Sequence, residues 1–389
     1  MVSKIDRSGG RGLPHDDADG AGALRRPRLP SQGYLPQLDG LRAVAVLFVI
    51  LFHTQSSWFP GGYIGVDLFF VLSGFLITGI LVSEYDRTGR VALGAFYARR
   101  ALRLLPALLF LALVLCVAYL VLVGPEQRER SIGAVLAAIA YATSPLAAAG
   151  VDLGSMLHAW SLSVEEYFYV VWPILLILLL RWVGRKRAIA AVAAVVAVAI
   201  GYRLIAALLG WPLERIYYAA DTRAEQLLIG CLLALILVNW ADRRPPAWLS
   251  VVSAVVLAAF VVTPGEVTAP FYRFGGSTFI AGAAALTIWG LVARSDGIMA
   301  RSLAVSPMVW VGKRSYGIYL WHAPIAALIV LALPEWVPLL PADLVITLVV
   351  AALSFRYIET PFLKLKTHFG ARRRSTGGRS ETGADLAST

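Results

Sequence analysis

Runs of about 20 mostly apolar residues recur along the chain from about residue 38 to residue 358. A run of this length is enough for a helix to cross the hydrocarbon core of a bilayer. The composition agrees, because 58% of the residues are hydrophobic, only 15% are charged, and the mean hydropathy is +0.71. Ordinary soluble domains have a smaller apolar share. The sequence therefore predicts an all-α, polytopic helix bundle in the lipid bilayer of the cell membrane.

The two ends of the chain differ from this apolar region. Residues 1–33 are rich in Gly, Arg and Asp and have no apolar stretch, which predicts a disordered basic arm rather than a signal peptide. Residues 363–389 have a similar composition and are predicted to form a disordered basic tail. Residues 34–362 are predicted to form a single membrane domain.

Basic residues at both ends predict that both termini are cytoplasmic, because excess Lys and Arg usually marks cytoplasmic segments. Two termini on one side require an even number of crossings. Apolarity alone gives eleven candidate spans: 38–56, 62–83, 104–123, 131–148, 162–180, 188–209, 222–240, 248–264, 277–293, 315–333 and 342–358. One of these must therefore fail to cross.

The Ala-rich candidate 131–148, interrupted by Ser144 and Pro145, is the one we expect to fail. Without it, every strongly basic connector falls on the same side of the membrane. These connectors are Arg87–Arg103, Arg181–Arg187, Arg243 with Arg244, and Arg294–Arg314. We therefore predict about ten transmembrane helices, with residues 124–160 outside the membrane or re-entrant.

Net charge and cysteine content suggest no further partner. The net charge of +11 fits the cytoplasmic loops of a membrane protein, so no nucleic-acid partner is expected. Cys116 and Cys231 both lie inside apolar runs, so neither a disulfide framework nor a metal site is expected.

The first span, LDGLRAVAVLFVILFH, contains Arg42 and His53, eleven positions apart. Eleven residues at about 100° each end some 20° from three full turns, so both side chains share one helix face, about 16 Å apart. Charged groups in hydrocarbon normally face a protein interior or a wet cavity. The alternatives are that Arg42 extends to the headgroups or pairs with Asp39, and that His53 caps the outer end of the helix.

Polar residues also occur in other apolar segments. Gly65 and Gly74 of the second span permit close helix approach. Glu165 and Glu166 point about 100° apart on a helix, so at most one of them faces the same cavity as its neighbours. Any of these polar residues could be a satisfied packing group, but together they predict a polar cavity, as in transporters and membrane enzymes. They are Asp67, Ser73, His158, Ser161, Ser163, Glu165, Glu166 and His322.

A basic cluster precedes the third span. FYARRALRLLP places Arg99 and Arg103 one helical turn apart, with Arg100 adjacent. One interpretation is ordinary anchoring at the cytoplasmic interface, which the charges alone favour. The other is a group of guanidinium groups for phosphates, which Arg binds in bidentate fashion. A phosphate-rich donor arriving from the cytoplasm would need such a site.

Six stretches in a fixed order resemble acyltransferase family 3, integral membrane acyltransferases that modify sugars of cell-surface polysaccharides, lipids and some secondary metabolites. They are YLPQLDGLRAVAVLFVILFH, GGYIGVDLFFVLSGFLIT, FYARRALRLLPALL, HAWSLSVEEYFYVVWP, GKRSYGIYLWH and RYIETPF, which together run from Tyr34 to Phe362. Some members carry a soluble hydrolase-like domain after the last span. Here 27 residues follow Phe362, so we expect any extra-membrane step to need a separate protein.

The resemblance implies roles for particular residues. Arg42 and His53 match the family's Arg and His pair, thought essential for acyl transfer. Glu165 matches the acidic position of the SLxxE pattern, and Glu359 the ExP pattern that closes the domain. The family's arginine motif, associated with the acyl-coenzyme A donor, is matched by Arg99, Arg100 and Arg103.

The mechanism we expect combines the residues with the resemblance. The donor is acyl-coenzyme A, which is a substrate and not a bound cofactor, and the acyl group is expected to be acetyl. His53 either acts as a general base on an acceptor hydroxyl or carries the acyl group itself. Arg42 contacts the donor, and Glu165 orients His53 or His158. Asp67, His158 and His322 are expected to bind substrate.

The sequence leaves the acceptor and two alternative functions open. The acceptor is either a carbohydrate or a glycosylated small molecule such as a macrolide. A non-enzymatic transporter or flippase of a lipid-linked sugar would explain the spans, the histidines and the carboxylates, but not the arginine cluster. A sensor or scaffold would leave nearly all intramembrane polar groups unexplained.

Overall fold

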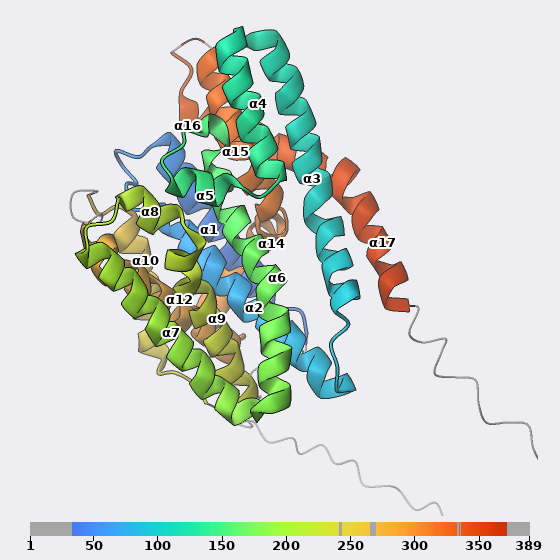
Figure 1. Cartoon of the computed structure of the whole chain (residues 1–389), viewed down its shortest axis with the longest axis vertical. Helices are drawn as coiled ribbons and strands as arrows, with labels where there is room; N and C mark the ends of the chain where they lie inside the picture. The colour runs from blue at the N-terminus through green and yellow to red at the C-terminus, as the bar shows by residue number, and fades with distance from the viewer. Residues whose placement is uncertain (1–32, 241–242, 265–269, 333, 335, 372–389) are drawn as a thin grey trace, which may run out of the picture.

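The computed structural model describes residues 33–240, 243–264, 270–332, 334 and 336–371, and all regular elements within these ranges are helical. The predicted all-α fold is therefore confirmed (Figure 1). The elements are α1 (Pro36–Thr54), α2 (Ile64–Thr88), α3 (Leu93–Leu122), α4 (Pro125–Ile139), α5 (Thr143–Ala148), η1 (Gly154–Ala159), α6 (Trp160–Trp182), α7 (Gly184–Leu208), α8 (Leu213–Tyr218), α9 (Ala220–Asn239), α10 (Ala247–Val261), η2 (Tyr272–Gly276), α12 (Ser277–Ala293), α13 (Ile298–Leu303), α14 (Ser306–Lys313), α15 (Ser315–Ala332), α16 (Leu339–Ser354), η3 (Phe355–Glu359) and α17 (Thr360–Ala371).

Eight helical stretches in the described residues are long and apolar enough to cross a membrane. They are Pro36–Thr54, Ile64–Thr88, Leu93–Leu122, Gly154–Trp182, Gly184–Leu208, Tyr272–Ala293, Ser315–Ala332 and Leu339–Leu365. The two further predicted spans correspond to α9 and α10. The first two turns of α9 carry Arg223 and Glu225, and α10 has 15 residues, fewer than the roughly 20 that cross hydrocarbon. The chain is a multi-pass membrane protein.

Residues 125–148 form two short helices, α4 and α5, and neither is among the eight candidate spans. The break between them lies at Tyr141, whose φ of 53° is rare for a residue other than glycine, and not at Ser144 and Pro145, which lie within α5. α4 begins with polar residues and packs against the upper part of α3 (Figure 1). The absence of 131–148 from the candidate spans agrees with the charge count, but the predicted segment 124–160 overlaps the candidate span Gly154–Trp182. Its place outside the membrane or re-entrant stays a prediction.

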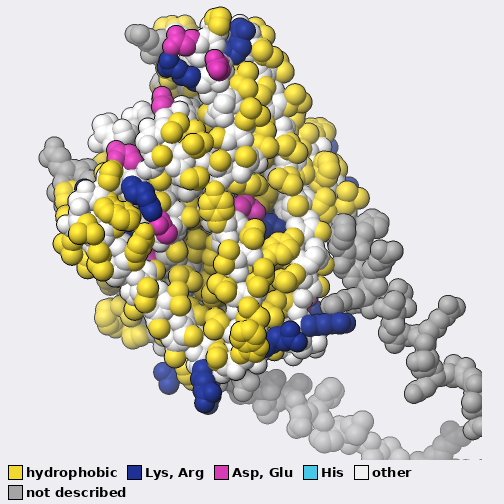
Figure 2. Space-filling view, in the orientation of Figure 1, with side chains coloured by type: hydrophobic (Ala, Val, Ile, Leu, Met, Phe, Trp, Pro, Cys, Tyr) yellow, Lys and Arg dark blue, Asp and Glu magenta, His cyan; other side chains and the backbone are white. Residues whose placement is uncertain are grey.

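The structure places two of the predicted basic connectors at one end of the molecule. Arg185, at the start of α7, forms an ion pair with Asp86, near the end of α2. Figure 2 shows an apolar surface over the middle of the visible face, with Lys and Arg side chains gathered along its lower edge. Which side of the membrane this end faces stays a prediction. Residues 1–32 and 372–389 lie outside the described ranges, and α17 extends helical structure into the predicted tail as far as Ala371.

Helix α2 lies at the centre of the bundle and packs closely against α1 and α9. A Cβ atom at Gly65 would collide with the carbonyl oxygen of Ala45 in α1, and one at Gly74 with that of Leu227 in α9. The backbones therefore approach as closely as the two glycines allow, as the sequence predicted for both.

Two ion pairs are buried among α2, α7, α9 and η2. Arg223 Nη2 lies 3.2 Å from Asp67 Oδ1, and the Tyr272 hydroxyl donates to the same oxygen at 3.0 Å. Arg203 Nε donates to Glu225 Oε1 at 2.9 Å, and Arg203 Nη1 donates to the Tyr272 carbonyl at 3.3 Å. Tyr272 thus links both pairs through its hydroxyl and its carbonyl.

Four aromatic rings surround the guanidinium group of Arg223. Its Cζ atom lies 5.1 to 5.5 Å from the ring centres of Tyr217, Trp160, Tyr272 and Phe70. A desolvated guanidinium group is attracted to such rings by their quadrupoles. The rings thus replace part of the favourable solvation that this charge would have in water.

We predict that Gly74→Ala destabilises the protein, because the added methyl group forces the backbones of α2 and α9 apart. Overpacking of this kind lowers the free energy of unfolding by about 1–3 kcal/mol or more. The measurement is the melting temperature of purified protein in detergent. Gly282→Ala in α12 is the matched control, since its Cβ would meet no atom within 4 Å. An equal loss in both variants would contradict the prediction.

Asp67→Asn is predicted to lower the free energy of unfolding by about 3–5 kcal/mol, because it leaves the buried Arg223 charge without its carboxylate. The check is the same melting temperature, compared with the double variant Asp67→Asn with Arg223→Met, which removes both charges and recovers part of the loss. An unchanged melting temperature together with weaker substrate binding would instead make Asp67 a substrate ligand.

Candidate active site

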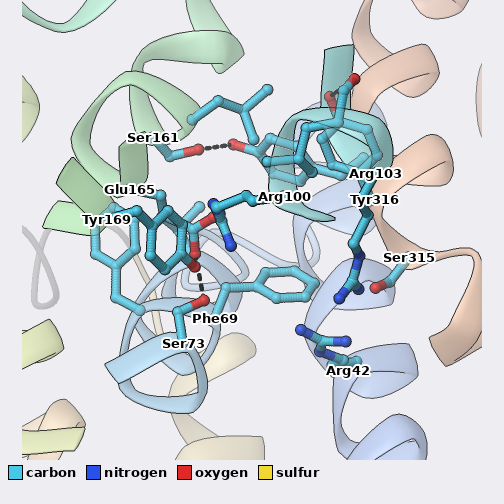
Figure 3. Close-up of a pocket in the computed structure, with 15 residues that line it drawn as sticks. Arg42, Phe69, Ser73, Arg100, Arg103, Ser161, Glu165, Tyr169, Ser315 and Tyr316 are labelled. Atoms are coloured by element: carbon cyan, nitrogen blue, oxygen red, sulfur yellow. Dashed lines mark hydrogen bonds between the residues drawn. The ribbon is translucent and has the colours of Figure 1, made fainter. Parts of the chain in front are cut away.

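Two cavities adjoin each other between α1, α2, α6 and α15. We call the first the arginine cavity; its polar lining residues are Arg42, Ser73, Arg100, Arg103, Ser161, Glu165, Tyr169, Ser315, Tyr316 and Tyr319 (Figure 3). We call the second the histidine cavity; its lining residues are Val49, Phe52, His53, Tyr63, Val66, Leu157, His158, Trp160, Tyr217, Tyr218 and Tyr319. The empty volume is about 600 Å³ in the first and about 380 Å³ in the second.

Arg42 and His53 line different cavities although they share α1. Two residues, Val66 and Tyr319, line both cavities. Asp39 accepts a hydrogen bond from the Tyr34 hydroxyl at 2.6 Å and is not paired with Arg42 in the described part of the chain. The arginine is therefore turned into the protein, as the cavity interpretation predicted.

Three guanidinium groups converge on the arginine cavity. Arg100 Nε donates to Glu166 Oε1 at 3.0 Å, and its guanidinium group stacks on the ring of Tyr169. Arg42 and Arg103 have no hydrogen bond or ion pair with any other described residue, and Figure 3 shows their guanidinium groups turned toward each other. Neither guanidinium group forms a direct ion pair, although Glu165 interacts electrostatically with Arg42 and Glu359 with Arg103. Guanidinium N–H groups that face a cavity without a direct partner can donate to an anion there.

Arg99 differs from the other two residues of the predicted arginine motif. It does not line the cavity, and its Nη2 atom lies 4.0 Å from Glu84 Oε2. The pair that faces the cavity is thus Arg100 and Arg103, three positions apart and also one helical turn. The sequence alone did not distinguish this pair from Arg99 and Arg103.

Glu165 lies in the arginine cavity and not beside the histidines. Its Oε1 atom accepts a hydrogen bond from Ser73 Oγ at 2.6 Å (Figure 3). Among the described residues it makes no hydrogen bond with His53 or His158, the two residues it was expected to orient. Glu166 pairs with Arg100 outside the lining, so only one of the two adjacent carboxylates faces the cavity, as predicted.

Asp67 lines neither cavity, because it is buried in the ion pair with Arg223. Substrate binding by Asp67 stays a prediction that the geometry does not favour. Glu359 is buried beside Gly317 of α15, and its Oε1 atom has no hydrogen-bond partner within the described ranges.

The histidine cavity brings together three histidines from three elements. The ring centre of His322 lies 5.0 Å from that of His53 and 5.2 Å from that of His158. Of the three, His53 and His158 line the cavity and His322 packs behind them. Substrate binding by His158 and His322 stays a prediction. No group of three or more His, Cys, Asp or Glu side chains in the described part of the chain could hold a metal ion.

Hydrogen bonds to carbonyl oxygens determine which ring nitrogen of His53 and of His322 carries the proton and which keeps its lone pair. His53 Nδ1 lies 2.8 Å from the Val49 carbonyl oxygen and His322 Nδ1 lies 2.6 Å from the Tyr319 oxygen. Because a carbonyl oxygen only accepts, each Nδ1 carries the proton, and each neutral ring keeps its lone pair on Nε2. His53 is exposed to the cavity, whereas His322 is fully buried.

His158 has a different environment from the other two histidines. Its Nδ1 lies 2.9 Å from the Ser155 carbonyl oxygen, and its Nε2 lies 3.2 Å from the Leu320 carbonyl oxygen. Both nitrogens therefore face acceptors, and neither presents a lone pair to a substrate. His53 is the histidine best placed to accept a proton.

Sequence reasoning missed several lining residues. Tyr319 could have been found, because it lies three positions before His322 in SYGIYLWHAP and so shares its helix face. Tyr217 and Tyr218 come from the short helix α8, and their rings pack at 5.1 and 5.4 Å from that of Trp160. No periodic pattern marks α8, so no sequence signal indicated this aromatic wall.

Comparison with known proteins agrees with this geometry. A protein-family model described as "Acyltransferase domain" matches residues 35–357. The peptidoglycan O-acetyltransferase OatA of Listeria monocytogenes serovar 1/2a is 34% identical over 369 residues, which cover 88% of this chain and 58% of that protein. The O-acetyltransferase OatA of Staphylococcus aureus strain NCTC 8325 is 33% identical over 361 residues, which cover 87% of this chain and 59% of that protein.

A putative O-acetyltransferase of Staphylococcus aureus strain COL is also similar, at 32% identity over 353 residues, covering 85% of this chain and 58% of that protein. This chain thus spans less than three fifths of the length of these relatives. No solved structure matches it. The family model covers nearly the whole described bundle, including both cavities, and the chain therefore belongs to the membrane acyltransferase family 3.

Proposed function

We propose that this protein is a membrane O-acyltransferase that moves an acetyl group from acetyl-coenzyme A to a hydroxyl group of a carbohydrate. The observation that carries the proposal is the pair of adjoining cavities. One holds guanidinium groups that make no direct hydrogen bond or ion pair among the described residues, and the other holds a histidine with a free Nε2 lone pair. The relatives named O-acetyltransferases support the same reaction class.

The donor binds in the arginine cavity. Coenzyme A carries several phosphate groups, and guanidinium groups bind phosphate oxygens through paired, charge-assisted hydrogen bonds. Arg42 and Arg103 face the cavity without a direct hydrogen bond or ion pair among the described residues, and Arg100 is held in place by Glu166 and Tyr169. The basic connectors near this end predict that it faces the cytoplasm, where acyl-coenzyme A is made.

Chemistry takes place at His53. Its Nε2 atom removes the proton from the acceptor hydroxyl as the oxygen attacks the thioester carbonyl carbon. A carbon–oxygen bond forms, the carbon–sulfur bond breaks, and the thiolate of coenzyme A leaves and takes the proton from the histidine. The hydrogen bond from Nδ1 to the Val49 carbonyl keeps the ring in the required tautomer throughout.

The acceptor enters the histidine cavity. Tyr63, Trp160, Tyr217 and Tyr218 give this cavity an aromatic wall, which offers a flat apolar surface to one face of a sugar ring. Because one relative is named a peptidoglycan O-acetyltransferase, a cell-envelope glycan is the first acceptor class to test, ahead of small glycosylated metabolites.

We expect His53→Ala to reduce acceptor-dependent release of coenzyme A by about 10²- to 10⁴-fold, the usual contribution of a general base. The assay uses purified protein in nanodiscs with acetyl-coenzyme A and a panel of glycan fragments. His322→Ala is assayed alongside, and both variants must match the wild type in yield and melting temperature. Full activity in His53→Ala with loss in His322→Ala would assign the base to His322. A wild type that releases no coenzyme A with any acceptor would favour the transporter hypothesis.

Arg103→Gln is expected to raise the KM for acetyl-coenzyme A about tenfold or more, because one charge-assisted contact to phosphate is lost. Its effect should shrink at high salt, which screens the charges. Arg99→Gln is the matched control, since Arg99 lies four positions away and outside the cavity. Equal changes in the two variants would mean that general surface charge, and not the cavity, attracts the donor.

A further inference from the structure

Val66 and Tyr319 lie at the boundary between the two cavities, because they line both. Under the proposed function, phosphates are held on one side of this boundary and His53 lies on the other. The thioester carbon must therefore cross this boundary, past these two side chains, before it reacts. The width of this passage decides which acyl groups can follow it.

Tyr319 is held on its side of the passage by its hydroxyl group. The hydroxyl donates to the His158 carbonyl oxygen at 2.8 Å and lies 2.7 Å from Ser161 Oγ. Its ring centre lies 6.1 Å from that of Phe69 and 5.4 Å from that of His322, in edge-to-face and tilted contacts. The side chain is 4% exposed, so it cannot swing aside without breaking these contacts.

Val66 is equally constrained on the opposite side. A valine in a helix has one strongly preferred rotamer. The backbone at its neighbour Gly65 lies against the Ala45 carbonyl of α1, and its other neighbour, Asp67, is paired with Arg223 of α9. The position of the valine methyl groups is thus fixed by contacts to two other helices.

We propose that Val66 and Tyr319 form a fixed aperture that selects the acyl group by size, admitting acetyl and excluding longer chains. A closely packed and anchored boundary does not adapt to extra methylene groups. The acceptor must also share the histidine cavity with the acyl chain. The inference rests on the proposed function and adds a specificity determinant to it.

The test compares butyryl-coenzyme A with acetyl-coenzyme A as donors for wild type and Val66→Ala in nanodiscs. We expect the ratio of kcat/KM for butyryl over acetyl to rise about tenfold or more, the usual discrimination for a methylene in an apolar pocket. Val66 is a buried valine of the core, so Val66→Ala must match the wild type in yield and melting temperature before the ratios are compared. Val71→Ala is the matched control, because Val71 is a buried valine of α2 that lines neither cavity.

Tyr319→Phe provides a second variant that keeps the ring and removes its anchoring hydroxyl. We expect the butyryl to acetyl ratio to rise in it as well, by less than in Val66→Ala. If acetyl transfer persists and the butyryl to acetyl ratio is the same in Val66→Ala, Val71→Ala and the wild type, the aperture proposal is wrong and the proposed function stands. If the wild type transfers no acyl group to any acceptor, the proposed function itself fails, and the aperture with it.

Discussion

The ion pair between Asp67 and Arg223 fixes α2 at the position on which both cavities depend. Consecutive residues of a helix point about 100° apart, so Gly65, Val66 and Asp67 face three different neighbours. Gly65 meets the backbone of α1, Val66 borders the two cavities, and Asp67 pairs with α9. A shift of α2 at any of these contacts would move the boundary between the cavities.

The buried charges also support the wall of the histidine cavity. Burial of a charge is tolerated when it is paired, and Asp67, Arg203, Arg223 and Glu225 balance two acids against two bases. Trp160 and Tyr217 contact the guanidinium group of Arg223 on one side and line the cavity on the other. The same rings therefore shield a charge and shape a binding surface.

The sequence predicted what depends on local patterns and missed what depends on distant contacts. Apolar run length identified the eight candidate spans of the described residues but also counted α9 and α10, and Gly65 and Gly74 marked close helix approach. The ion pair of Asp67 was not predictable, because its hydrogen-bond donor Tyr272 is 205 positions away and lies in a short π-helical segment. For the same reason the sequence could not decide whether Glu165 faces the histidines or the arginines.

The geometry of α1 restricts the class of donor. Arg42 and His53 lie about 16 Å apart along one helix, and the helix does not stretch. A donor whose phosphates bind at Arg42 must therefore carry its reactive carbon at the end of an arm of about that length. In an acyl phosphate the carbonyl carbon is bonded directly to the phosphate, so phosphate binding at Arg42 would hold it far from His53. Under the proposed function, a thioester on the long, flexible arm of coenzyme A would meet both requirements, with its phosphates in one cavity and its reactive carbon in the other.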